Sequence, residues 1–262
     1  MKRLILFALI SITNLYAESQ DLSLFEKRWF VQNGDTLPYR ILYPANYDSA
    51  KKYPLVFFLH GSGERGSDNE IQLVHGAKFF LADSHRLKYP AFIIFPQCAK
   101  NKSWSNVQQV IEDSLRGKRT SYFADGGIPS NPMTLLQQLI FYTIQNYPVE
   151  KKQVYVGGLS IGAMGTYELV SREPKLFAAT FAICGRANPA IAGRLRYTRW
   201  WLFHGMKDDV VLPVYTQQME VALKKAGANV KATYYPGANH NSWAPAFAEP
   251  GLMRWLFAQR RR

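Results

Sequence analysis

The chain has 262 residues and carries 32 lysines and arginines against 19 acidic residues, a formal net charge of +13. Hydrophobic residues make up 47% and charged residues 19%, which excludes a disordered, collagen-like or coiled-coil protein. Two cysteines are too few for a disulfide-stapled fold, and no Cys/His cluster has the spacing of a structural zinc site. We therefore expect a globular chain that is long enough to bury a large core.

Residues 1–17 have the pattern of a secretory signal peptide. Lys2 and Arg3 form a positive start, a mostly apolar segment follows, and Ala17 offers a small residue at a cleavage point. A membrane anchor is the alternative, but the apolar run is shorter than the ~20 residues of a spanning helix. We expect cleavage, export to a bacterial periplasm or beyond, no stable membrane insertion afterwards, and one domain over residues 18–262.

After this segment, short apolar runs alternate with helical patterns. Asn33-Gly34 predicts a hairpin turn between strands over residues 24–31 and 36–43, since both turn residues accept positive φ. Six further strands are predicted, over residues 54–59, 91–95, 154–157, 178–183, 200–203 and 231–235. Helices are predicted over residues 133–145, 160–171, 214–225 and 250–259. This alternation predicts an α/β fold: a mostly parallel sheet with helices on both faces and an antiparallel hairpin at one edge.

Two connections bear on the site. Residues 185–197 are too few for an inserted lid domain. Residues 98–131 form a longer stretch, predicted to be irregular, and loops of this length in a compact domain are usually functional. Ligands of such sheets bind beyond the carboxyl ends of the strands, where we expect this loop to emerge.

The sharpest local motif is Gly158-Leu159-Ser160-Ile161-Gly162, between an apolar strand and a helical pattern. Gly-x-Ser-x-Gly between a strand and a helix is typical of a turn that exposes a nucleophilic serine. The glycines are needed because residues two before and two after the serine must be small. A plain strand-to-helix turn with the same spacing is the alternative.

Two other strand ends carry groups that would complete a serine nucleophile. Asp208 and Asp209 follow the strand that ends near His204, and His240 follows the last strand. A carboxylate can orient a histidine, which then takes the proton of the serine. The chain order Ser160, Asp208, His240 differs from the orders in chymotrypsin and subtilisin.

Taken together, these motifs resemble the α/β-hydrolase superfamily. The chain is similar to esterases related to dienelactone hydrolase and to the catalytic domain of prolyl oligopeptidase. It is most similar to a secreted predicted-peptidase, phospholipase/carboxylesterase-like group with kinship to feruloyl and acetylxylan esterases and polyhydroxybutyrate depolymerases. The matching segments are residues 60–66, 96–98 with 103–104, 158–162, 183–185, 204–208 and 240–243.

The resemblance implies a role for each of these residues. Ser160 would be the nucleophile, His240 the general base and Asp208 its partner, while the backbone N–H groups of Ser62 and Ile161 would form the oxyanion hole. This chemistry needs no cofactor and no metal.

The acid of the triad can be counted in two ways. The proline that usually stands four residues after the acid is Pro213, which would select Asp209. Counting from the strand end and His204-Gly205 selects Asp208, and we prefer it because the strand end fixes the reach to His240.

Three further residues are candidates for substrate binding. Trp104 and Trp243 flank the motifs and could stack on a sugar or phenolic ring, or could equally be core residues. Arg186 replaces a frequent glycine after Cys184-Gly185 and could alter specificity.

Cys98 and Cys184 end strands that should be three positions apart in the sheet. Three spacings of ~4.8 Å separate them by about 14 Å, which is too far for a disulfide. We expect two free, buried thiols.

Basic residues gather in two stretches without acids, and both include connections at the carboxyl edge. They are Lys175, Arg186, Arg194, Arg196, Arg199 and Lys207, and Arg86, Lys88, Lys100 and Lys102. They could attract an anionic polymer or lipid headgroup, or simply keep the protein soluble. No basic patch interleaved with aromatic residues indicates a nucleic-acid partner.

The sequence thus predicts an exported serine hydrolase that cleaves carboxylic esters through an acyl-enzyme. We expect an ester substrate that is carbohydrate-linked or anionic. The alternatives are a peptidase with the same triad and a non-catalytic, hydrolase-like binding protein.

Overall fold

The computed structural model describes residues 21–113, 118–123 and 127–261. The predicted signal peptide, residues 1–17, lies outside the described residues. From Asp21 a short 3₁₀ helix (Leu22–Leu24) leads into the first strand.

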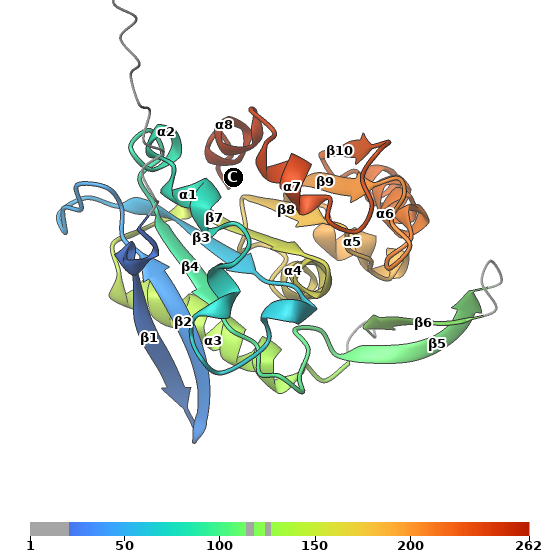
Figure 1. Cartoon of the computed structure of the whole chain (residues 1–262), viewed down its shortest axis with the longest axis horizontal. Helices are drawn as coiled ribbons and strands as arrows, with labels where there is room; N and C mark the ends of the chain where they lie inside the picture. The colour runs from blue at the N-terminus through green and yellow to red at the C-terminus, as the bar shows by residue number, and fades with distance from the viewer. Residues whose placement is uncertain (1–20, 114–117, 124–126, 262) are drawn as a thin grey trace, which may run out of the picture.

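Eight strands form the main sheet in the order β1-β2-β4-β3-β7-β8-β9-β10 (Figure 1). In this order, adjacent strands from β4 to β10 are parallel. Strands β1 and β2 form an antiparallel hairpin at one edge, where β2 pairs antiparallel with β4. The mostly parallel sheet with an N-terminal hairpin is therefore confirmed. The strands are β1 (Phe25–Gln32), β2 (Asp35–Leu42), β3 (Tyr53–Leu59), β4 (Phe92–Pro96), β7 (Val149–Leu159), β8 (Ala179–Ile183), β9 (Arg199–Gly205) and β10 (Val230–Tyr235).

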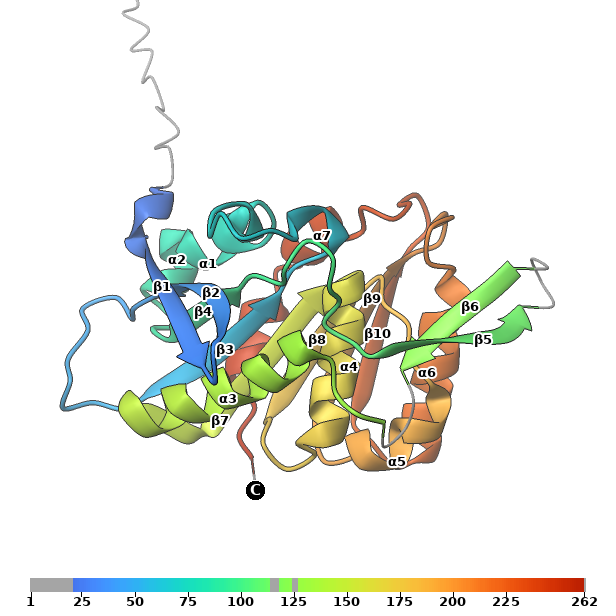
Figure 2. The same cartoon turned by 90° about the horizontal axis from the view of Figure 1, so that it is seen from below.

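Helices cover both faces of this sheet, as Figure 2 shows. One apolar core lies under α3, α4, α5 and α6, and a second lies under α1, α7 and α8. The helices are α1 (Ala77–Leu81), α2 (Asp83–Arg86), α3 (Asn131–Asn146), α4 (Ile161–Arg172), α5 (Ala192–Leu195), α6 (Pro213–Lys225), α7 (Trp243–Phe247) and α8 (Leu252–Phe257). In the described part of the chain, no helix has the length and apolar character needed to cross a membrane.

Because helices cover both faces of the sheet, the sequences of the central strands are continuous apolar runs. All five residues of β4 and of β8 are buried, and so are the last five of β3. On one face of the sheet, Phe58 of β3 packs against Phe95 of the neighbouring β4 and against Phe181 of β8, which lies beyond β7. Because the core faces occupy both sides of the strands, polar groups that act on a ligand must lie at the strand ends.

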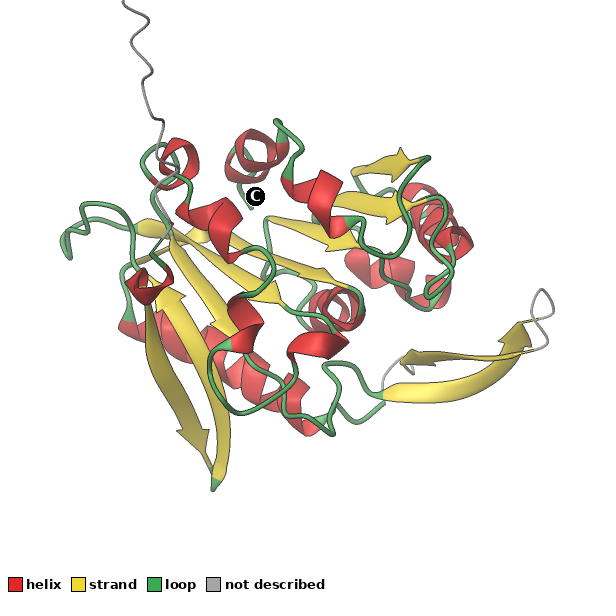
Figure 3. Cartoon of the chain, in the orientation of Figure 1, coloured by secondary structure: helices red, strands yellow, loops and turns green. Residues whose placement is uncertain are grey.

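The stretch 98–131 was expected to be irregular, and this is wrong in part. It contains an antiparallel pair, β5 (Val107–Asp113) and β6 (Lys118–Phe123), that is separate from the main sheet. In Figure 3 the pair extends away from the rest of the molecule. The pattern was missed because the sequence of this pair lacks the regular alternation of apolar and polar residues that marks a half-buried strand.

Both basic stretches include connections at the carboxyl edge of the sheet, as expected, but several of their residues lie at the opposite edge. Lys175 and Arg196 precede β8 and β9, and Arg199 is the first residue of β9, so these three lie at the amino edge. Arg186 and Lys207 follow the same two strands at the carboxyl edge.

The prediction for the cysteines is confirmed. Strands β3 and β7 separate β4, which Cys98 follows, from β8, which Cys184 follows. Both thiols are free and buried, and burial raises the pKa of each to about 12. Neither cysteine is therefore a reactive thiolate at neutral pH.

Candidate active site

Ser160 occupies a strained turn between β7 and α4. Its φ is +53° and its ψ is −118°, a conformation that non-glycine residues rarely adopt and that costs about 1–3 kcal/mol. The turn is held by its backbone: the N–H of Ser160 donates to the carbonyl of Ile183 at 2.9 Å, and its carbonyl accepts from the N–H of Met164 at 3.1 Å. The serine is thereby fixed at the carboxyl edge of the sheet.

The two glycines of the motif are required by contact distances. A Cβ on Gly158 would lie 2.5 Å from the carbonyl carbon of Gly162, and a Cβ on Gly162 would lie 2.0 Å from the carbonyl oxygen of Leu59. Both obstacles are backbone atoms, which cannot rotate away. The motif therefore reflects a turn so tight that helix α4 begins directly against the end of β3.

A chain of hydrogen bonds joins Ser160, His240 and Asp208. Nε2 of His240 lies 3.1 Å from Oγ of Ser160, and Nδ1 lies 2.8 Å from Oδ2 of Asp208. Because the ionised carboxylate only accepts, Nδ1 must carry the proton, which leaves Nε2 free to accept the serine proton. The arrangement is that of a nucleophile, a general base and an orienting acid. It selects Asp208 as the residue in contact with His240.

Asp208 is almost completely enclosed, with 3% of its surface exposed. Its Oδ1 accepts from the N–H groups of Val210 (3.0 Å) and Val211 (2.9 Å). Its Oδ2 faces His240 and also His204, whose Nε2 lies 3.1 Å away. Burial by itself raises the pKa of Asp208, but hydrogen bonds from His204, His240 and Val211 outweigh it and hold the pKa well below its usual range. The carboxylate stays ionised at every pH at which an esterase works.

His204 is a second histidine partner of Asp208, although in the sequence it served only to mark the end of a strand. Its side chain is fully buried, and its Nε2 also lies 2.8 Å from the carbonyl oxygen of Val211. Both neighbours of Nε2 accept, so this nitrogen carries a proton. Nδ1 contacts the hydroxyl of Thr216 at 2.7 Å. The signal in the sequence was the spacing of four residues between His204 and Asp208 after a strand.

Replacing His204 by leucine should lower kcat by about 10- to 100-fold, as expected for the loss of a charge-assisted hydrogen bond of about 1.5–3 kcal/mol. KM should stay unchanged because His204 is buried away from any substrate.

The same variant should lose stability in a pH-dependent way. The depressed pKa of Asp208 stabilises the fold above the unfolded pKa near 3.9, and this contribution disappears as pH falls through the folded pKa. The loss of unfolding free energy in the variant should therefore be largest near pH 7 and shrink below pH 4. Denaturant titrations at several pH values measure this. A loss that does not vary with pH, with kcat unchanged, would contradict the assigned contact.

The loop after β3 lies directly beside Ser160. A Cβ on Gly61 would lie 3.6 Å from Cβ of Ser160 and 2.7 Å from Cδ1 of Leu159. Ser62 begins a short 3₁₀ helix (Ser62–Glu64), and Ile161 begins α4. The first N–H groups of a helix have no partner inside it, which suits both residues to the predicted oxyanion hole.

His60 fixes this loop rather than acting as a base. It is fully buried, its Nδ1 lies 2.6 Å from the carbonyl oxygen of Gly61, and its Nε2 accepts from the N–H of Cys98 at 2.9 Å. Burial lowers the pKa of His60 to about 4, so the ring is neutral at physiological pH. The carbonyl of His60 accepts from Nε1 of Trp104 at 3.2 Å.

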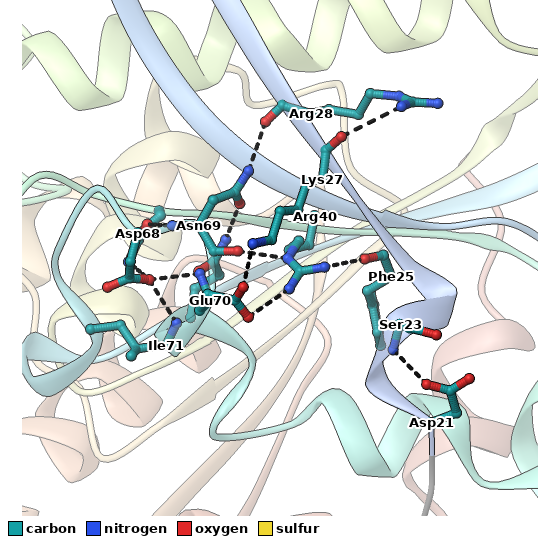
Figure 4. Close-up of polar contacts among 12 residues, drawn as sticks. Asp21, Ser23, Phe25, Lys27, Arg28, Arg40, Asp68, Asn69, Glu70 and Ile71 are labelled. Carbon is teal, nitrogen blue, oxygen red and sulfur yellow. Dashed lines mark hydrogen bonds and ion pairs between the residues drawn. The ribbon is translucent and has the colours of Figure 1, made fainter.

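The far end of the same loop is tied to the edge hairpin, as Figure 4 shows. Arg40 of β2 is buried; its Nε donates to the carbonyl of Asn69 at 2.6 Å, and its Nη2 pairs with Glu70 at 2.9 Å. Nη1 of Arg40 donates to the carbonyl of Phe25 in β1. Asp68 accepts from the N–H groups of Glu70 and Ile71. The hairpin thus serves as a rigid support for the segment that carries Ser62.

The structure separates the three candidates for substrate binding. Trp104 is fully buried, with its ring against His60, so its assignment to substrate binding is wrong and the core alternative holds. Trp243 is half-buried, and its ring meets the ring of His240 edge-on at a centroid distance of 5.7 Å. Arg186 is half-buried with its guanidinium 5.9 Å from the ring centre of Tyr215. Trp243 and Arg186 therefore remain candidates.

An apolar cluster adjoins Ser160 on the side of α6. It comprises Met164, Val211 and Tyr215, with Ile161, Leu212 and Val214 packed against it. Ile161 follows Ser160, and Val211 donates to Asp208, so the cluster touches the triad through both. It provides an apolar wall beside the reacting atoms.

Sγ of Cys184 and the nearest ligand atoms of Asp208 and His240 all lie within 4.8 Å of one another. This is the donor set of a possible cation site, but the oxygens of Asp208 already accept from four N–H groups and the thiol is protonated. The group is therefore built as a hydrogen-bonded triad with a neutral thiol beside it.

The profile of the phospholipase/carboxylesterase family matches residues 46–249. The chain belongs to this family. The phospholipase/carboxylesterase family is part of the α/β-hydrolase superfamily, which the sequence motifs had indicated. The matched range includes Ser160, Asp208 and His240.

Solved structures agree in fold. A thermostable esterase is 30% identical, with a TM-score of 0.80, over 91% of this chain and 64% of its own. A ferulic acid esterase from Anaeromyces mucronatus is 15% identical, with a TM-score of 0.63, over 90% of both chains. The acylaminoacyl peptidase of Pyrococcus horikoshii is 14% identical, with a TM-score of 0.62, over 91% of this chain and 42% of its own.

Among curated proteins, a probable dipeptidyl-peptidase 5 from Aspergillus niger is 38% identical over 66 residues. This match covers 25% of the chain and 9% of that peptidase. The chain thus spans only part of the length of this relative and of the thermostable esterase.

Proposed function

We propose that the protein is a serine hydrolase that cleaves carboxylic esters through an acyl-enzyme. The observation that carries this proposal is the continuous hydrogen-bond chain from Oγ of Ser160 through His240 to Asp208, on a strained turn at the carboxyl edge of the sheet. Membership of the phospholipase/carboxylesterase family supports an ester as the substrate.

In the proposed reaction, each step has a group that can carry it out. Oγ of Ser160 attacks the ester carbonyl while its proton moves to Nε2 of His240, and the N–H groups of Ile161 and Ser62 stabilise the oxyanion. The bond to the alcohol breaks, and the alcohol leaves with the proton from His240. Water then attacks the acyl-serine and gives a proton to His240. The acid departs as Oγ of Ser160 takes that proton back.

Two features support an ester with one apolar and one aromatic or sugar part. The apolar wall that Met164, Val211 and Tyr215 form suits a hydrocarbon group next to the scissile bond. On the other side, Trp243 borders His240, where its ring could stack on a sugar or phenolic group. A carbohydrate-linked ester fits both sides. The signal-like start of the sequence supports action in the periplasm or outside the cell.

A substrate panel tests the proposal. We expect kcat/KM for p-nitrophenyl acetate and for methyl ferulate to exceed that for an aminoacyl-p-nitroanilide by more than about 100-fold, since an amide leaving group is harder to expel. A preference for the anilide would instead support a peptidase, the activity in the names of the Aspergillus and Pyrococcus proteins. Folded protein that hydrolyses none of them, at any pH between 6 and 9, would favour a non-catalytic binding protein.

A further inference from the structure

A cavity of about 520 Å³ lies at the amino edge of the sheet, between the starts of β8, β9 and β10. We call it the amino-edge pocket. Four cationic side chains line it, together with Tyr197 and Asn229; the cations are Lys175, Arg196, Arg199 and Arg261. Ser160 follows β7 and lies at the opposite, carboxyl edge of the same sheet. Strand β9 has seven residues, so the two edges of the sheet are about 20 Å apart along it at ~3.3 Å per residue.

The charges of the pocket have no acidic partners within the part of the chain that the structure describes. No carboxylate lines the cavity, and the ion pairs of the described residues include none of the four cations. The adjacent Arg260 is different, since it pairs with Glu150 at 2.8 Å. Four like charges around one cavity repel each other, so the pocket favours an anion.

The cations are held in place by neutral groups. Nη1 of Arg261 donates to the carbonyl of Lys175 at 2.6 Å, and Nη1 of Arg199 donates to the carbonyl of Arg260 at 3.1 Å. The guanidinium of Arg196 lies 4.8 Å from the ring centre of Tyr197, and its Nη2 donates to the hydroxyl of that ring at 2.7 Å. Each guanidinium has five N–H donors, so most donors remain available for a ligand.

Arginines in this number favour a planar or tetrahedral oxyanion that accepts several hydrogen bonds, and a phosphoryl group is the common ligand of that kind. The cavity is larger than one phosphate, and Tyr197 is 49% exposed at its wall. We propose that the amino-edge pocket binds the phosphoryl group of a phosphorylated ligand, away from the ester-cleaving site. The ligand is either a soluble phosphate compound or the headgroup of an anionic phospholipid.

Calorimetry with pyrophosphate, at constant ionic strength, tests the binding. The double variant Lys175→Ala/Arg196→Ala removes two of the four charges, and Lys78→Ala/Lys100→Ala removes two charges from exposed residues outside the pocket. We expect the pocket variant to bind at least about tenfold more weakly and the control variant to bind like the wild type. Lys175→Glu alone should also weaken pyrophosphate binding, and it provides the test if the double variant does not fold. Equal affinity in all variants, or no binding to the wild type, would overturn the proposal.

Flotation with vesicles distinguishes the two sources of the phosphoryl group. If the ligand is a headgroup, the wild type and the control variant should float with phosphatidylglycerol vesicles but not with phosphatidylcholine vesicles, and the pocket variant should float with neither. If only pyrophosphate binds, the ligand is soluble. Esterase activity should be the same in all variants and with or without pyrophosphate. A failure of the phosphoryl-binding proposal therefore leaves the proposed function untouched, and a failure of the proposed function leaves the phosphoryl-binding proposal untouched.

Discussion

Replacing Ser160 by alanine should lower kcat for p-nitrophenyl acetate by about 10⁴- to 10⁶-fold, because no other group on the turn can form the acyl-enzyme. The residual rate should come from the oxyanion donors and from substrate binding alone. The hydroxyl of Ser160 is the hydrogen-bond partner of Nε2 of His240, so its removal leaves the base without a proton to take. Steady-state kinetics with the purified variant measure this loss.

Ser171→Ala is the matched control for this change. Ser171 lies in α4, the helix that Ser160 precedes, and is 5% exposed against 7% for Ser160. It should retain full activity, and circular dichroism and thermal melting should show that both variants are folded. A folded Ser160→Ala variant with undiminished activity would rule out Ser160 as the nucleophile.

Replacing Asp208 by asparagine should lower kcat by about 10⁴-fold, the size expected when the base histidine is held in the wrong tautomer. The N–H groups of Val210 and Val211 require an oxygen at the position of Oδ1. The new amide NH₂ must then face His240 and His204, and it donates where the carboxylate accepted. Nδ1 of His240 must become an acceptor, which places the ring proton on Nε2 and blocks transfer from Ser160.

Asp209→Asn provides the comparison, since it makes the same change one residue later. Asp209 is exposed, and His240 hydrogen-bonds to Asp208 instead. We expect kcat of Asp209→Asn to stay within about threefold of the wild type, because the carboxylate that orients His240 is that of Asp208. A large loss in this variant with little in Asp208→Asn would reverse the assignment of the acid.

Much of the fold could be predicted because both faces of the sheet are covered. Each central strand is then a short apolar run, and helix starts such as Pro132 and Pro213 mark the intervening segments. The ribbon β5–β6 lacked this signal, since its sequence has no regular alternation of apolar and polar residues. Sequence distance also misplaced the basic residues: Lys175 and Arg196 are close in sequence to the strand ends but precede their strands.

The candidate triad could be predicted because Ser160, Asp208 and His240 each follow a strand of a parallel sheet, whose carboxyl ends meet at one edge. The residues that surround the triad could not be predicted, because their positions depend on how loops distant in sequence pack together. Trp104 is buried because its segment crosses α4 at Gly165, where a Cβ would lie 2.4 Å from the Cβ of the tryptophan. The contact of His204 with Asp208 depends on the curl of the loop after β9, which no sequence period records.

Labelling with a fluorophosphonate, followed by mass spectrometry of the digested protein, tests the central claim most directly. A phosphonyl group is transferred only to a serine whose proton is removed by a neighbouring base and whose oxyanion is stabilised. We expect one phosphonyl group per chain, on Ser160, with esterase activity lost in proportion to labelling, and no label on the folded Asp208→Asn variant over the same time. A protein that keeps full activity after labelling, or that carries the label on another residue with Ser160 unmodified, would contradict the account.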